Sequence, residues 1–165
     1  MLLYLLRHGI AEDHGSRATD EERELTEEGM EKTTLVMRAA KKMRLETPQL
    51  IISSPLVRAK QTADIAHKEF GALASTLISE TLVPSADLSV TMSLVAEHIR
   101  EHSPLMLVGH EPHLSTFATA LLGSTSSMIE MKKAALAAFE LHRIDPIRMR
   151  GVLTALIPPK IANLI

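Results

Sequence analysis

The sequence predicts an α/β fold: a three-layer α/β/α sandwich whose central sheet is mainly parallel. Short apolar runs without charged residues, typical of strands buried on both faces, alternate with longer segments whose apolar residues recur at helical spacing. Such alternation favours parallel strands with helices on both faces of the sheet. No repeat or Gly/Ser-rich linker divides the 165 residues, so we expect a single domain over residues 1–165.

The first predicted strand covers residues 1–6, where the Tyr4 hydroxyl is the only polar side-chain group. It ends at Arg7, His8 and Gly9. In open α/β sheets, ligands bind at the carboxyl ends of the strands. Glycine also allows a backbone N–H to approach an anion closely. Taken alone, the triplet suits an ordinary strand end with a solvated Arg-His pair equally well.

A polar loop and a helix are expected next. Residues 10–24 carry many charges and are predicted to form one wall of a pocket at the ligand edge. Thr26 is expected to cap the helix, with acidic residues in the first turn and an end before Pro48. Its predicted face at helical spacing consists of Met30, Thr33, Met37 and Ala40.

The second strand and helix repeat this arrangement. Residues 49–53 predict a short strand that runs into the turn Ser53-Ser54-Pro55. Arg58 lies in the first turn of the following helix, so a second cation is expected at the same sheet edge. The stripe of this helix is made of Ala59, Ala63, Ala66 and Phe70.

The remaining elements are expected in the same alternation. A strand at 105–108 ends in Gly109 and His110, which brings a second histidine to the ligand edge. The other predicted elements are an edge strand at 76–79, a helix marked by Leu88, Met92, Val95 and Ile99, a helix at 114–122, and strands at 133–141 and 152–157.

Composition excludes several classes of function. The net charge of −2 provides no broad basic field for nucleic acid or an acidic membrane. The absence of cysteine excludes thiolate catalysis and Cys-bearing zinc sites. The sequence shows neither the pattern of a signal peptide nor an apolar run of membrane-spanning length, so we expect a soluble, cytoplasmic protein.

The three strand ends predict a site for a phosphoryl group. They supply two arginines, whose planar forks match phosphate oxygens, and two histidines, which act as nucleophile, acid or charge donor. A metal ion suits this set poorly because the arginines would repel it. The predicted phosphate-binding residues are Arg7, Gly9, Arg58, Gly109 and His110.

These residues resemble the signature of the histidine phosphatase superfamily, which includes phosphoglycerate mutases and acid phosphatases. The chain is most similar to small bacterial phosphohistidine phosphatases of the SixA type, and the resemblance implies a phosphoglycerate mutase-like fold. The segments that carry it follow the family's order: the RHG motif at residues 7–9, RELTEEG at 23–29, SSPLVRAKQT at 53–62 and VGHEP at 108–112.

The resemblance implies roles for four residues. His8 would be the nucleophile and become transiently phosphorylated, and Arg7, Arg58 and His110 would hold the non-bridging oxygens. Water would then release inorganic phosphate from His8. The attacking nitrogen of His8 must be unprotonated, whereas His110 helps most as a cation. No cofactor and no metal are implied.

The proton donor is not identified by the sequence. Glu80 and Glu111 are possible acids, and His14 is a possible residue of the pocket rim. An imidazole, with a conjugate-acid pKa of about 6.5, leaves far more easily than an alkoxide. A missing acid would therefore favour phosphohistidine, presented by a phosphorelay or phosphotransfer protein, as the substrate.

Several alternatives remain open at this point. A small-molecule phosphomonoesterase of the same superfamily would need an acid over the phosphate, and a non-catalytic module would only recognise phosphate. Residues 98–102 match the H-x-x-E-H zinc pattern, which we interpret as coincidence among surface histidines. A basic docking face for an acidic partner is a further alternative to a solvated surface, formed by Lys132, Lys133, Arg143, Arg148 and Arg150.

Overall fold

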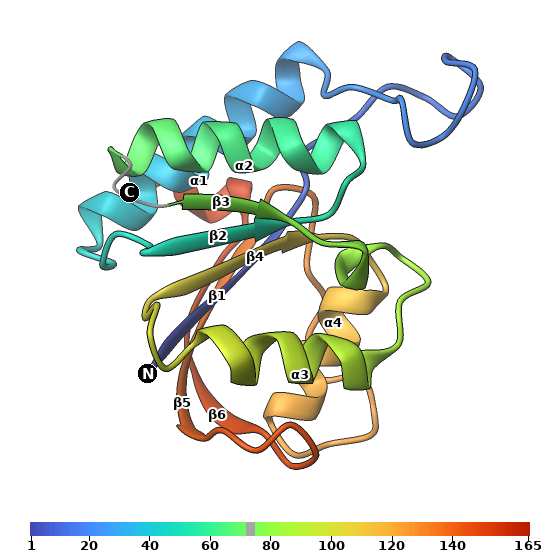
Figure 1. Cartoon of the computed structure of the whole chain (residues 1–165). Helices are drawn as coiled ribbons and strands as arrows, with labels where there is room; N and C mark the ends of the chain where they lie inside the picture. Colours follow the sequence, from blue (N-terminus) through green and yellow to red (C-terminus); the bar gives the residue numbers. More distant parts are fainter. Residues whose placement is uncertain (72–74) are drawn as a thin grey trace.

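A six-stranded sheet in the order β3-β2-β4-β1-β5-β6 organises the computed structural model, which describes residues 1–71 and 75–165 (Figure 1). The strands are β1 (Leu2–Arg7), β2 (Leu50–Ser53), β3 (Ser75–Ile78), β4 (Leu105–Gly109), β5 (Leu136–Arg143) and β6 (Arg150–Ile157). The helices are α1 (Glu27–Lys42), α2 (Val57–Phe70), α3 (Leu88–His98), α4 (His113–Leu121), α5 (Pro159–Ala162) and the 3-10 helix η1 (Glu80–Leu82).

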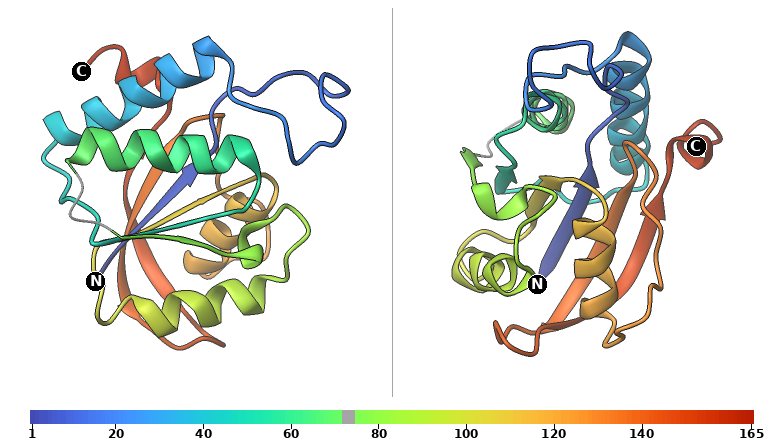
Figure 2. Two further views of the ribbon diagram at one scale, coloured as in Figure 1. Left: turned by 45° about the horizontal axis from the view of Figure 1, so that its top comes forward. Right: turned by 90° about the vertical axis from the view of Figure 1, so that its right-hand side faces the viewer.

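Helices cover both faces of the sheet, which confirms the predicted three-layer fold. Helices α1, α2 and α5 pack on one face, and α3 and α4 pack on the other (Figure 2). Successive residues of a strand point to opposite faces. Leu3 and Leu5 of β1 therefore join the α3–α4 core, while Tyr4 and Leu6 join the α1–α2 core. Both faces of β1 are buried, as its unbroken apolar run predicts.

The central strands β1 and β4 bring two strand ends together. They pair in parallel with Arg7 opposite Gly109, and β2 pairs in parallel with β4 so that Ser53 lies opposite Val108. Three strands therefore end at one edge of the sheet. Thr26 caps α1 by accepting a hydrogen bond from the Gly29 backbone N–H at 3.0 Å, as predicted. No helix of the described residues is long and apolar enough to span a membrane.

Several details differ from the sequence-based expectations, among them the bounds of the last two strands, which are Leu136–Arg143 and Arg150–Ile157 in place of 133–141 and 152–157. The strand expected to begin at residue 133 begins at Leu136, because Ala134 has a positive φ of 63° in a turn that precedes it. Helical spacing places Met30 on the buried face of its helix, but it is 43% exposed; Val36 and Ala39 complete that face instead. The last two strands run as an antiparallel hairpin at one side of the sheet.

Gly29 fits tightly against the chain that leaves β1. A Cβ added there would lie 2.0 Å from the carbonyl oxygen of Ile10. Replacing glycine by alanine inside an exposed helix normally stabilises by roughly 0.5–1 kcal/mol. At this position the added methyl group must instead displace the backbone that follows His8. Overpacking therefore makes the expected change in stability a loss.

We therefore expect Gly29→Ala to lower the free energy of unfolding by about 1–3 kcal/mol. Urea titration followed by circular dichroism measures this change. Glu31→Ala, at an exposed position of the same helix, is the matched control and should stay within about 0.5 kcal/mol. A Gly29→Ala protein as stable as the wild type would contradict the packing argument.

Candidate active site

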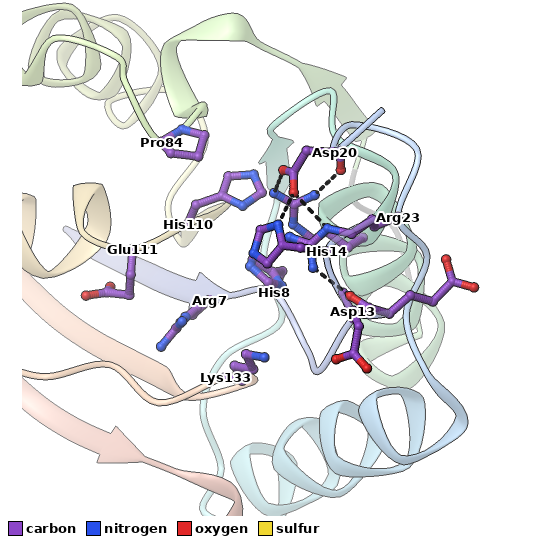
Figure 3. Close-up of a pocket in the computed structure, with 13 residues that line it drawn as sticks. Arg7, His8, Asp13, His14, Asp20, Arg23, Pro84, His110, Glu111 and Lys133 are labelled. Atoms are coloured by element: carbon purple, nitrogen blue, oxygen red, sulfur yellow. Dashed lines mark hydrogen bonds and ion pairs between the residues drawn. The ribbon is translucent and has the colours of Figure 1, made fainter. Parts of the chain in front are cut away.

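A cavity of about 330 Å³ opens at the sheet edge where β1 and β4 end; we call it the His8 cavity (Figure 3). The loop between β1 and α1 forms one of its walls, as the sequence predicts. Its lining also includes the start of α2, the turn after β4 and the segment before β5. The residues are Arg7, His8, Ala11, Glu12, Asp13, His14, Asp20, Arg23, Arg58, Pro84, His110, Glu111 and Lys133.

His8 is held by hydrogen bonds from its backbone and its ring. Its backbone N–H donates to the Gly109 carbonyl at 3.0 Å, and its carbonyl accepts from the Ala134 N–H at 3.0 Å. The ring Nδ1 lies 2.7 Å from the Gly9 carbonyl oxygen. Because a carbonyl can only accept, Nδ1 carries the proton in the neutral ring, and Nε2 keeps a free lone pair. The geometry thus fixes the tautomer that a nucleophile requires.

Three other side chains in the cavity hold buried nitrogens that lack a hydrogen-bond partner among the described residues. They are Nε of Arg7, Nε of Arg58 and Nδ1 of His110. The other ends of these side chains are fixed: Arg7 Nη1 donates to the Met131 carbonyl at 2.7 Å, and His110 Nε2 lies 2.8 Å from the Ser54 hydroxyl. Buried polar atoms normally have partners, so this cluster fits an oxyanion.

Asp20 is a member of the cavity that the sequence analysis missed. Its carboxylate accepts from Arg58 Nη2 at 2.8 Å and from Arg23 Nε at 2.7 Å, and its backbone carbonyl accepts from Arg58 Nη1 at 2.7 Å. One edge of the Arg58 guanidinium is thereby occupied, while Nε is left free. Nothing in the sequence marks Asp20 among the several acids of the loop, because the pairing depends on how the loop folds back over α2.

The two histidines lie together, with ring centroids 4.8 Å apart. Burial, with repulsion from His110 and the two arginines, lowers the pKa of His8 to about 3 against the pull of its hydrogen bond to Gly9. Burial, followed by repulsion from Arg58, lowers the pKa of His110 to about 3 as well. Both rings are therefore neutral at pH 7 in this structure, whereas the sequence analysis favours a cationic His110.

The two glycines of the predicted site do not line the cavity. The Gly9 N–H donates to the Thr62 hydroxyl at 3.1 Å, so it is not free to bind an anion in this structure. A Cβ at Gly9 would lie 2.7 Å from the Thr33 hydroxyl oxygen, so close packing against α1 requires the glycine. Gly109 contributes its carbonyl to the His8 N–H.

The three residues considered as a possible acid or as part of the pocket rim lie in different surroundings. His14 lines the cavity with a largely exposed ring, whose Nδ1 lies 3.0 Å from the Asp20 carboxylate. Glu111 lines it too, and its carboxylate accepts from the Ser115 N–H at 3.2 Å. Glu80 lies in a neighbouring cavity that shares only Asp20 and Pro84 with this one.

The zinc-like pattern at residues 98–102 forms no metal site in the described part of the chain. No group of three or more His, Cys, Asp or Glu side chains that could hold a metal ion gathers there or elsewhere among the described residues. His98 ends α3, and its ring centroid lies 6.3 Å from that of His102. His113 lies three residues after His110 in the sequence but does not line the cavity. It is buried, and its Nε2 lies 2.8 Å from the Thr91 hydroxyl oxygen.

Comparison with known proteins gives the family. A model of the histidine phosphatase superfamily (branch 1) matches residues 3–82. An uncharacterised protein of Picosynechococcus sp. is 36% identical over 137 residues, which cover 81% of each chain. The matched segment of the family model contains His8, both arginines of the cluster, and Asp20.

Solved structures share the fold along the whole chain. SixA, a protein histidine phosphatase solved with tungstate, superposes with a TM-score of 0.84 at 21% identity, covering 100% of both chains. A SixA structure from Agrobacterium tumefaciens has a TM-score of 0.78 at 24% identity, covering 96% of this chain and 97% of that one. A mycobacterial glucosyl-3-phosphoglycerate phosphatase has a TM-score of 0.69 at 19% identity, covering 93% and 97%. By its match to the family model, the chain belongs to the histidine phosphatase superfamily.

Proposed function

We propose that this protein is a cytoplasmic phosphohistidine phosphatase that acts through a phosphohistidine intermediate on His8. The observation that supports it best is the cluster in the His8 cavity. There, the free Nε2 lone pair of His8 shares one cavity with unpartnered buried nitrogens of Arg7, Arg58 and His110. A phosphoryl group would accept hydrogen bonds from these nitrogens while His8 attacks phosphorus.

The proposed reaction has two displacements. In the first, Nε2 of His8 bonds to phosphorus as the bond to the leaving nitrogen breaks. That electron pair stays on the departing ring, which leaves as neutral imidazole because its other nitrogen already carries a proton. Arg7, Arg58 and His110 hold the non-bridging oxygens, where charge collects in the transition state. A phosphoryl dianion beside His110 would favour a proton on this ring, opposing its burial. In the second displacement, water attacks phosphorus, and His8 and inorganic phosphate are released.

The charge state of Asp20 supports phosphohistidine as the substrate. Burial alone would raise the pKa of Asp20, but its pairs with Arg23 and Arg58 outweigh this effect and hold the pKa below its usual value. Asp20 is therefore an anion at neutral pH, unsuited to protonate an alkoxide. A departing imidazole needs less help. Glu111 and His14 also line the cavity, so each is a candidate donor if esters prove to be substrates.

A small-molecule phosphomonoesterase is the second candidate. The similarity in fold to a mycobacterial glucosyl-3-phosphoglycerate phosphatase supports it. The two candidate functions differ in the leaving group of their substrates. Rates of phosphate release from a phosphohistidine peptide and from phosphate esters therefore distinguish them.

Phosphate release without added metal should be faster from a phosphohistidine peptide than from phosphoserine or p-nitrophenyl phosphate. His8→Ala should lower kcat/KM on the peptide by at least about 10³-fold, because the nucleophile is lost. His142→Ala, an exposed histidine at the far end of β5, is the matched control and should keep full activity. Faster, His8-dependent hydrolysis of the esters would instead support the phosphomonoesterase and direct attention to Glu111 and His14.

Arg58→Lys should lower kcat/KM by about 10²-fold, because lysine keeps the charge but lacks the planar fork and the Nε donor. The measurement is steady-state kinetics on the phosphohistidine peptide. Arg148→Lys, an exposed arginine of the β5–β6 turn, controls for the change of side chain. A loss of less than about threefold with Arg58→Lys would argue against a direct role on the phosphoryl oxygens.

The ring of His8 should stay neutral from pH 8 down to about pH 5, because its pKa lies near 3. Ring ¹⁵N chemical shifts report this protonation state directly. The urea-unfolded chain is the reference, since its histidines titrate near about 6.5. Unfolding should also become easier as pH falls below about 6.5, because the unfolded chain then binds a proton that the folded His8 does not. A His8 midpoint close to 6.5 in the folded protein would contradict the effect of burial on this ring.

A further inference from the structure

Three neighbouring cavities share lining residues with the His8 cavity, and their charges differ. One shares Glu111 and is lined by hydroxyl groups and a second acid, Glu130. Another shares Asp20 and contains further acids. The third shares Lys133 and is lined by lysines. Carboxylates therefore line two flanks of the His8 cavity and lysines line the third, although Glu130 also pairs with Lys132, and Asp20 with Arg23 and Arg58.

The basic flank is a pocket of about 260 Å³, which we call the lysine pocket. It lies where the chain leaves β1, enters β5 and leaves β6, so the sheet topology places it beside the His8 cavity. Its apolar walls are Ile10, Pro158 and Pro159. Its four ammonium groups come from α1, the segment before β5, and α5: Lys32, Lys132, Lys133 and Lys160. Lys133, drawn in Figure 3 among the residues of the His8 cavity, lines both cavities.

The charge of the lysine pocket is only partly compensated. Lys32 pairs with Glu28, and Lys132 pairs with Glu130. Lys133 and Lys160 make no ion pair with any other described residue. The pocket thus keeps about two positive charges on a chain whose net charge is −2.

The structure separates the residues of the basic docking face that was considered from the sequence. Arg143 is the last residue of β5, Arg148 lies in the β5–β6 turn, and Arg150 is the first residue of β6. That turn lies at the opposite edge of the sheet, because β5 runs antiparallel to β1 and Glu140 pairs with Leu2. Lys132 and Lys133 are instead joined by Lys32 and Lys160, which are distant in the sequence.

We propose that the lysine pocket binds an acidic segment of the phosphohistidine-bearing protein, on one side of its phosphohistidine. This inference rests on the proposed function. A partner that presents its phosphohistidine to the His8 cavity meets carboxylates on two flanks and lysines on the third. Acidic side chains are favoured only over the lysine pocket, so the charges also fix the orientation of the partner. Charges at the edge of an interface act mainly on the association rate and weaken with salt.

Two phosphohistidine peptides test this proposal: one has four glutamates on one side of the phosphohistidine, and the other has glutamines in their place. At low salt, kcat/KM of the wild type should be about tenfold higher for the glutamate peptide. The preference should decline as salt is added. In the double variant Lys32→Glu, Lys160→Glu it should disappear, while p-nitrophenyl phosphate, too small to reach the lysine pocket, is hydrolysed at the wild-type rate.

The matched control is the double variant Lys68→Glu, Arg148→Glu, which changes the net charge by the same amount. Both side chains are exposed and lie at the opposite edge of the sheet, so the peptide preference should persist. Equal wild-type rates on the two peptides, or a preference that survives in the lysine-pocket variant, would overturn the docking site alone. If no phosphohistidine peptide is hydrolysed while p-nitrophenyl phosphate is, the proposed substrate fails, and the docking site with it.

Discussion

The parallel pairing of β1 with β4 is the constraint on which the rest of the site depends. It places Arg7 opposite Gly109, so that the residues following the two strands, His8 and His110, leave the sheet together. The His8 N–H donates to the Gly109 carbonyl and the His8 carbonyl accepts from the Ala134 N–H, which joins three segments that are distant in the sequence. Since these strands are buried on both faces, the site is anchored on the core of the sheet.

Burial gives the site its electrostatic character. Two guanidinium groups and two imidazoles share a small volume, and each buried nitrogen that lacks a partner costs about 1–3 kcal/mol. An oxyanion that accepts from these nitrogens recovers this energy, so anion affinity is obtained at the expense of fold stability. The same burial keeps His8 neutral, which preserves the lone pair on its Nε2 at physiological pH.

The sequence predicts the features that follow from apolar periodicity and from the ends of strands. It predicts few of the contacts that form only when distant segments fold together. The apolar runs of β1, β2 and β4 locate His8, His110 and the turn before Arg58, because parallel strands end at a common edge. The antiparallel direction of β5 does not follow from the sequence, because the spacing of apolar residues marks a strand without giving its direction in the sheet. The role of Asp20 and the gathering of Lys32 with Lys160 also escape the sequence analysis, because only the folded chain brings these residues to their partners.

The Asp20–Arg58 contact links the loop between β1 and α1 to helix α2. Asp20 holds Arg58 through both its carboxylate and its backbone carbonyl, and Arg23 holds the same carboxylate. The loop is therefore part of the scaffold that orients a buried guanidinium, although most of its residues are exposed. Among related chains, the length and acids of this loop should vary together with the residues that contact α2, so that loop and helix evolve as one unit.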